Sequence, residues 1–123
     1  MLKLGILFFS LICCSGCYYD TQEALYGNTQ CVTDTVNVTY SAKISKIISA
    51  NCGICHSGPS ASGGGGVVLD NYNDLQNQAV NGKLMNDINQ NPGYNAMPPN
   101  GSKLTPCQIE TIQYWLKNGA PSN

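Results

Sequence analysis

Charge is scarce in this chain of 123 residues. Charged side chains make up 11% of the sequence, whereas about a quarter is usual in globular domains. Arginine is absent, and six lysines against seven acids give a formal net charge of −1. No part of such a sequence could neutralise a row of phosphates, so nucleic-acid binding is excluded as its function.

Histidine and long apolar runs are also scarce, whereas cysteine is abundant. There is one histidine, and the apolar run from Leu4 to Ile12 is too short for the roughly 20 residues that cross a bilayer as a helix. Seven cysteines in so short a chain indicate an oxidising compartment, a metal or a covalent cofactor. The length leaves room for one small domain.

The first residues have the pattern of an export signal. Lys3 precedes the apolar run, as in secretory signals. Ser15-Gly16-Cys17 then resembles the lipobox of bacterial lipoproteins, although Cys14 stands where that motif usually has leucine. The resemblance implies that residues 1–16 are removed and that Cys17 is lipidated, which would hold the protein on a membrane without spanning it. A simple secretory signal is the alternative.

The rest of the chain predicts short helices separated by irregular loops. Residues 18–40 are polar, and the alternation of Val36, Val38 and Tyr40 suggests a short extended segment. Residues 57–66 are small and flexible and predict a surface loop, and the prolines and glycines of residues 90–104 exclude regular structure there. Helices are expected over residues 41–51, from 70 or 71 to about 80, over 83–89, and from about 106 to 118.

The apolar positions of these helices give their expected buried faces. Ser41 is the expected N-cap of the first helix. The last helix has a capping box in Thr105 and Gln108, with Trp115 flanking its apolar face and Gly119 ending it. The inward residues are expected to be Ile44, Ile47, Ile48, Leu75, Ala79, Val80, Leu84, Ile88, Ile109, Ile112 and Leu116.

One motif carries the chemistry: Cys52-Gly53-Ile54-Cys55-His56 has the spacing C-x-x-C-H. This spacing is the attachment signature of haem c. Two thiols three residues apart can reach the two vinyl groups of one porphyrin and form thioethers, and the histidine that follows is placed as the proximal ligand of the iron. The motif therefore predicts one covalent haem.

Three other interpretations of the motif compete with haem attachment. A structural zinc site needs four nitrogen or sulfur ligands, and only Cys31 and Cys107 remain in the fold to complete one. A thioredoxin-like redox pair needs a βαβ context, which the sequence does not predict. A plain disulfide between Cys52 and Cys55 leaves His56 unexplained.

Residues 41–120 resemble a small monohaem class I c-type cytochrome, and more narrowly the lipoprotein cytochrome c domains of bacteria such as the Bacteroidetes. The resemblance rests on a helix leading into CGICH, a loop after it, a Met-Pro loop and an aromatic-bearing last helix, in that order. It implies an all-α fold, with a single cytochrome c-like domain over residues 41–123 wrapped around one haem. Residues 17–40 would be a lipidated, mostly irregular tether.

The distal axial ligand of the iron is predicted to be Met97. His56 is the sole histidine, which excludes ligation by two histidines, and Met1 leaves with the signal. Met97 lies in the proline-rich loop where the resembled family has its axial methionine, whereas Met85 fits a helical core position. A sixth site that is vacant or holds another ligand is the remaining alternative. Residues expected to pack on the haem are Ile54, Val67, Val68, Leu69 and Tyr94.

The remaining cysteines predict a disulfide. With Cys17 lipidated and Cys52 and Cys55 on the haem, Cys31 and Cys107 are left over, and an even remainder in an oxidising compartment favours pairing. Such a bridge would stabilise the fold by about 4 kcal/mol in the chain-entropy model. Two unpaired thiols are the alternative.

The predicted function is electron transfer, without enzyme activity. The resemblance places the protein in the bacterial periplasm or on the outer membrane or cell surface, held by its lipid, as a monomer or a subunit of a redox complex. Neutral or basic redox proteins are its expected donors and acceptors, bound transiently. A haem ligand sensor, a peroxidase-like enzyme with an open sixth site, and a haem-stabilised accessory subunit of a surface complex remain as alternatives.

Overall fold

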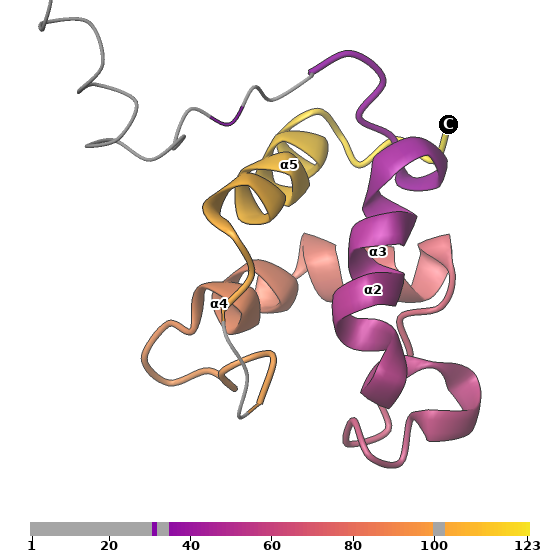
Figure 1. The fold of residues 1–123 in the computed structure, drawn as a ribbon, viewed down its shortest axis with the longest axis vertical. Helices are drawn as coiled ribbons and strands as arrows, with labels where there is room; N and C mark the ends of the chain where they lie inside the picture. Colours follow the sequence, from indigo (N-terminus) through magenta and orange to yellow (C-terminus); the bar gives the residue numbers. More distant parts are fainter. Residues whose placement is uncertain (1–30, 32–34, 100–102) are drawn as a thin grey trace, which may run out of the picture. The chain divides into compact units, whose positions relative to one another are not determined.

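The computed structural model describes residues 31, 35–99 and 103–123, and this part of the chain is helical and contains no strand (Figure 1). The predicted all-α class is confirmed. The signal segment, Cys17 and residues 17–30 lie outside the described residues. The helical elements, in chain order, are η2 (Tyr40–Ile44), α2 (Ser45–His56), η3 (Gly58–Ser60), α3 (Tyr72–Val80), α4 (Lys83–Asn89) and α5 (Pro106–Lys117).

The helix that carries the cysteine motif is longer than predicted at both ends. Thr39 is its N-cap, with the side-chain oxygen accepting a hydrogen bond from the N–H of Ala42, so the predicted cap at Ser41 is wrong. A wide first turn starts the helix early, since the N–H of Ile44 donates to the carbonyl of Thr39 at 3.2 Å. The helix then continues through η2 and α2 to His56, which makes the whole C-x-x-C-H motif helical.

The two middle helices follow the prediction closely. Asn71 caps α3, its side chain accepting from the N–H of Asp74 at 3.0 Å. Gly82, in the left-handed region with φ 77°, separates α3 from α4. Val80 was expected to point inward, but this is wrong: it is 72% exposed, whereas Ala79 beside it is buried. The predicted inward residues of these two helices that are buried are Leu75, Ala79, Leu84 and Ile88.

The last helix, α5, has the predicted capping box and packs through its tryptophan. Thr105 and Gln108 make both reciprocal hydrogen bonds, at 3.3 and 3.0 Å. Trp115 is fully buried and its indole N–H donates to the carbonyl of Pro121 at 2.9 Å. It therefore lies at the centre of the buried face, and its predicted flanking position is wrong.

The two ends of the described domain lie side by side (Figure 1). The N–H of Tyr40 donates to the carbonyl of Pro121 at 2.9 Å, and that of Ser41 to the carbonyl of Ser122 at 3.1 Å. Before them, Val38 is buried whereas Val36 is 66% exposed. The predicted extended segment is wrong, because the chain turns at Asn37, whose φ is 56°.

Cys31 and Cys107 lie at disulfide-bonding distance, as predicted. Their sulfurs are 2.03 Å apart and their Cα atoms 5.1 Å apart. The pair joins the segment before η2 to the first turn of α5. None of the helices in the described ranges has the length and apolar character needed to span a bilayer.

Candidate haem-binding site

The four residues predicted to hold a haem line one cavity of about 320 Å³, a volume in the range of cofactor sites. Its walls come from the end of α2, the segment 64–69, α4 and the loop 95–99. α2 lies across from α4 in Figure 1. The predicted residues on the wall are Cys52, Cys55, His56 and Met97.

The end of α2 presents both thiols and the imidazole together. Cys52, Cys55 and His56 stand at positions i, i+3 and i+4 of one helix, and residues with this spacing share a face. Both thiols are free and partly buried. Burial raises the pKa of the Cys52 thiol to about 11, because an apolar environment disfavours the thiolate.

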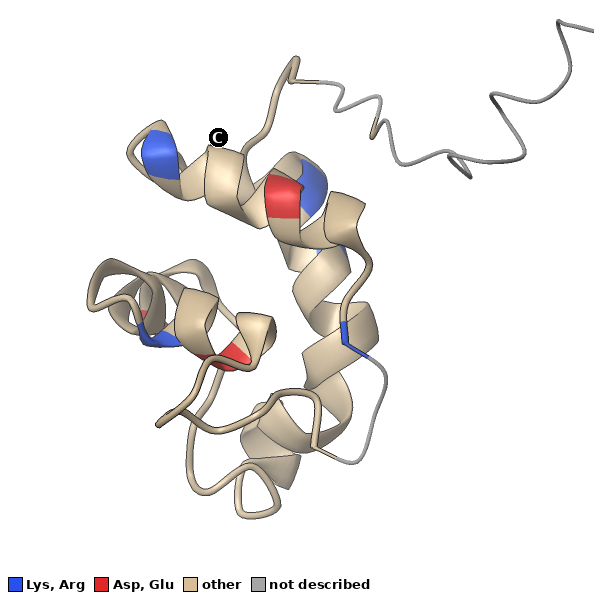
Figure 2. Ribbon diagram, turned by 90° about the vertical axis from the view of Figure 1, so that its left-hand side faces the viewer, with Lys and Arg blue, Asp and Glu red and all other residues tan. Residues whose placement is uncertain are grey.

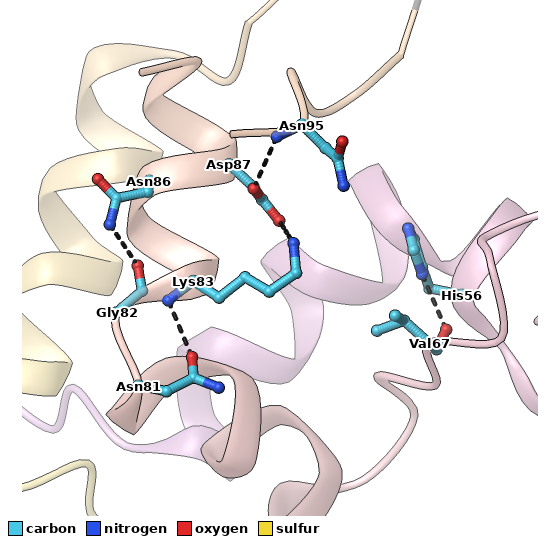
Figure 3. Close-up of polar contacts among 8 residues, drawn as sticks. All are labelled: His56, Val67, Asn81, Gly82, Lys83, Asn86, Asp87 and Asn95. Atoms are coloured by element: carbon cyan, nitrogen blue, oxygen red, sulfur yellow. Dashed lines mark hydrogen bonds and ion pairs between the residues drawn. The ribbon is translucent and has the colours of Figure 1, made fainter. Parts of the chain in front are cut away.

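The ring of His56 is oriented by one hydrogen bond. Its Nδ1 lies 2.8 Å from the carbonyl oxygen of Val67 (Figure 3). Because a carbonyl oxygen can only accept, Nδ1 carries the hydrogen and donates it, which leaves the lone pair of Nε2 available to a metal. The N–H of Leu69 also donates to the carbonyl of His56, at 2.8 Å. His56 is 9% exposed, and these bonds hold its ring in one orientation.

The glycine-rich segment 57–66 is more than the surface loop that its composition predicted. Most of it is exposed, but a Cβ atom on Gly64 would lie 2.5 Å from the carbonyl oxygen of Cys55 and 2.6 Å from Nδ1 of His56. Any side chain at this position would therefore collide with the imidazole. The segment closes over the buried side of His56.

The two candidate methionines lie in different environments. Met97 lines the cavity, whereas Met85 packs against the hydrophobic core and is absent from the cavity wall. The N–H of Met97 donates to the carbonyl of Asp87 at 3.1 Å. This bond fixes the loop before α5 against α4.

Sequence reasoning missed a charged pair on the cavity wall. Lys83 and Asp87 lie one turn apart on α4 and form an ion pair, and both line the cavity (Figure 3). Asp87 is buried, with 8% of its surface exposed. The spacing i, i+4 of a lysine and an acid was the available signal, but it is common on solvated helices and does not indicate a cavity.

Three of the five residues expected to pack on a haem line the cavity. They are Ile54, Val67 and Leu69; Val68 and Tyr94 do not line it. Ile54 is nonetheless 85% exposed, so it lies at the mouth of the cavity. Val68 is partly buried away from the cavity wall, and Tyr94 is 51% exposed.

The residues fit a haem of the c type. Two thiols, an imidazole with its Nε2 available and a thioether on one cavity are the protein groups that such a haem requires. In the described ranges, no group of three or more His, Cys, Asp and Glu side chains gathers as a metal site. The ligands that zinc would need are used elsewhere, since Cys31 and Cys107 lie at bonding distance from each other.

The helical fold and this set of protein groups define a haem protein of the c type. Over 84 residues the chain is 36% identical to a cytochrome c6 of Synechococcus sp., covering 63% of this chain and 69% of that protein. The chain belongs to the c-type cytochromes. No family model matches it, and no solved structure matches it significantly.

Proposed function

We propose that the protein is an electron carrier outside the cytoplasm. One haem would be attached through Cys52 and Cys55, with His56 and Met97 as the axial ligands of its iron. The observation that supports this most strongly is the convergence of these four side chains on one cavity. When bound, the haem supplies an iron centre that gains and loses one electron.

Two backbone carbonyls hold the proposed iron ligands in place. The carbonyl of Val67 holds the ring of His56 from behind, and the carbonyl of Asp87 holds the backbone of Met97. Ligands that keep the same position in both oxidation states limit the structural cost of each transfer. The thioether of Met97 favours the ferrous state, and so raises the reduction potential relative to ligation by two histidines.

The rim of the cavity suits a transient partner that docks through weakly charged contacts. Residues 47–69 contain no lysine, arginine, aspartate or glutamate, and Figure 2 shows the end of α2 and the loop after it without charge. Lys83 and Asp87 on the wall neutralise each other. This composition favours donors and acceptors that bind weakly and with little electrostatic steering.

The N-terminal residues support an anchored location. Residues 1–16 would be removed as a lipoprotein signal and Cys17 would carry the lipid, both on the basis of the lipobox-like sequence. Residues 17–40 would serve as the tether of the domain 41–123, and the end of this tether is joined to the domain by Cys31 and Val38. The protein would then face the periplasm or the cell surface, beside membrane-bound redox proteins.

Substitution of Met97 tests the proposed function. Met97→Ala should open the sixth site and lower the reduction potential by a large margin, because the thioether that favours ferrous iron is removed. The measurements are the absorption spectrum of the ferric protein and a potentiometric titration. Met85→Ala is the matched control and should keep the Met–iron charge-transfer band. A wild-type spectrum and potential in Met97→Ala would reassign the distal ligand.

A further inference from the structure

The loop that carries Met97 is fastened to one residue of α4. The N–H of Met97 donates to the backbone carbonyl of Asp87 at 3.1 Å. The N–H of Asn95 donates to the carboxylate oxygen Oδ1 of the same residue, also at 3.1 Å (Figure 3). Asp87 therefore binds two alternate N–H groups of the loop, one with its main chain and one with its side chain.

The start of the loop is also bonded to Asp87, so that both ends of the loop meet at this residue. Gln90 ends the helix in the left-handed region, with φ 57°, and its N–H donates to the carbonyl of Asp87 at 3.0 Å. One turn of the loop is closed by the N–H of Asn91, which donates to the carbonyl of Asn86 at 3.0 Å. Residues 90–97 thus form a closed loop that is attached to α4 at Asn86 and Asp87, and Met97 and Asn95 are both held by Asp87.

The side chain of Asp87 is buried, and its second oxygen is compensated. Oδ2 pairs with the ammonium group of Lys83, whose side chain is 38% exposed. A buried carboxylate is stable only when its oxygens have such partners. The ion pair lies on the wall that Met97 shares, and the wall residues of α2 and of the segment 64–69 carry no charge.

We infer, on the basis of the function proposed above, that Asp87 is a positioning residue for the distal ligand. Its carboxylate holds the loop closed and so keeps Met97 against the iron in competition with ligands from solution. The ammonium group of Lys83 neutralises the negative charge of this carboxylate on the cavity wall. Neither residue touches the iron in this arrangement, and both act through the position of Met97.

The test is a titration of the ferric holo-protein with imidazole, which competes for the site held by Met97. Asp87→Ala removes the carboxylate and leaves the backbone carbonyl. We expect it to bind imidazole about tenfold more tightly than the wild type, because a hydrogen bond to a charged group contributes about this factor. Asp87→Asn keeps an oxygen that can accept from Asn95 but loses the charge, and should bind imidazole less tightly than Asp87→Ala.

The matched control removes a carboxylate elsewhere. Glu110 is exposed on α5, and Glu110→Ala should bind imidazole as the wild type does. An affinity of Asp87→Ala equal to that of the wild type would overturn the inference. Should the alanine variant not accumulate with haem, Asp87→Asn still tests the inference. Imidazole binding tenfold tighter than in the wild type, although an accepting oxygen for Asn95 is retained, would contradict it.

The ferric spectrum of the wild type distinguishes a failure of this inference from a failure of the proposed function. A ferric wild type without a low-spin spectrum and a Met–iron band would overturn the proposed ligation, and the inference with it. A wild type that shows the band, beside an alanine variant that binds imidazole no more tightly, would overturn the role of Asp87 alone.

Discussion

At the scale of single residues, the imidazole of His56 depends on neighbours that have no haem chemistry of their own. The carbonyl oxygen of Val67 accepts the hydrogen bond from the ring. Gly64 leaves room for the ring because it has no side chain. The motif C-x-x-C-H specifies which atoms could bind a haem, but it does not orient them. The orientation comes from residues 64–69, which fold back onto the end of α2.

Substitution of Gly64 should therefore disturb the proximal side. The methyl group of Gly64→Ala would meet the carbonyl of Cys55 and the ring of His56, and overpacking of this kind costs about 1–3 kcal/mol. We expect a lower free energy of unfolding and an altered ferric absorption spectrum, measured by denaturant titration and spectroscopy. Gly63→Ala is the control, because its Cβ would come no closer than 3.4 Å to the carbonyl of Ser60. Equal behaviour of the two variants would contradict the close packing at Gly64.

The buried thiol predicts a pH dependence in the haem-free chain. Burial raises the pKa of Cys52 to about 11, so at about pH 8 the group is a protonated thiol and reacts slowly. Alkylation of Cys52 should accelerate as the pH rises toward 11, and the stability from burying the neutral thiol, present below about pH 9, should fall over the same interval. Iodoacetamide labelling read by mass spectrometry measures the rate. The same rate in the folded and the denaturant-unfolded chain at about pH 8 would contradict the burial.

At the scale of the elements, local signals predicted the side-chain caps of α3 and α5. Thr105 and Gln108 cap α5, and Asn71 caps α3, whereas the cap of η2 is Thr39 and was predicted two residues too late. The end of α2 could not be predicted in this way, because residues 52–56 have no apolar period and no terminating signal. Its helix continues to His56, whose carbonyl accepts the N–H of Leu69. That hydrogen bond links the end of α2 to residue 69, and no periodic pattern in the sequence connects these two segments.

The cysteine pair ties one element to a distant segment. Cys31 and Cys107 are 76 residues apart in sequence, and the crosslink restricts the unfolded chain. The double variant Cys31→Ser with Cys107→Ser should lose about 4 kcal/mol in its free energy of unfolding, measured by denaturant titration. Its reduction potential should remain that of the wild type, because the pair is absent from the cavity wall. An undiminished stability, or a shifted potential, would contradict a purely mechanical role.

At the scale of the whole molecule, the fold class and four of the residues that line the cavity could be predicted because their signals are short and local. The motif at residues 52–56 and Met97 in its proline-rich loop can both be recognised in the sequence alone. The role inferred for Asp87 could not be predicted from the sequence. It depends on the hydrogen bond from the N–H of Asn95, which forms only when the loop folds back onto α4. Trp115 was misplaced for a related reason, since its partner is the carbonyl of Pro121 beyond the helix.

The distribution of charge also belongs to the whole molecule. Figure 2 shows no charged residue at the end of α2 or in the loop after it. The mouth of the cavity instead presents Ile54, which is 85% exposed. Electron transfer through this face would depend on close contact more than on charge attraction.

The central claim is that one haem is bonded to the chain through Cys52 and Cys55. Its most direct test is haem-dependent staining of denatured protein, matured in a host that attaches haem c, together with its intact mass. The claim predicts that the chain stays stained and carries the mass of one haem, and that Cys52→Ser with Cys55→Ser abolishes both signals. A denatured chain without colour, in which both thiols react with an alkylating reagent, would contradict it.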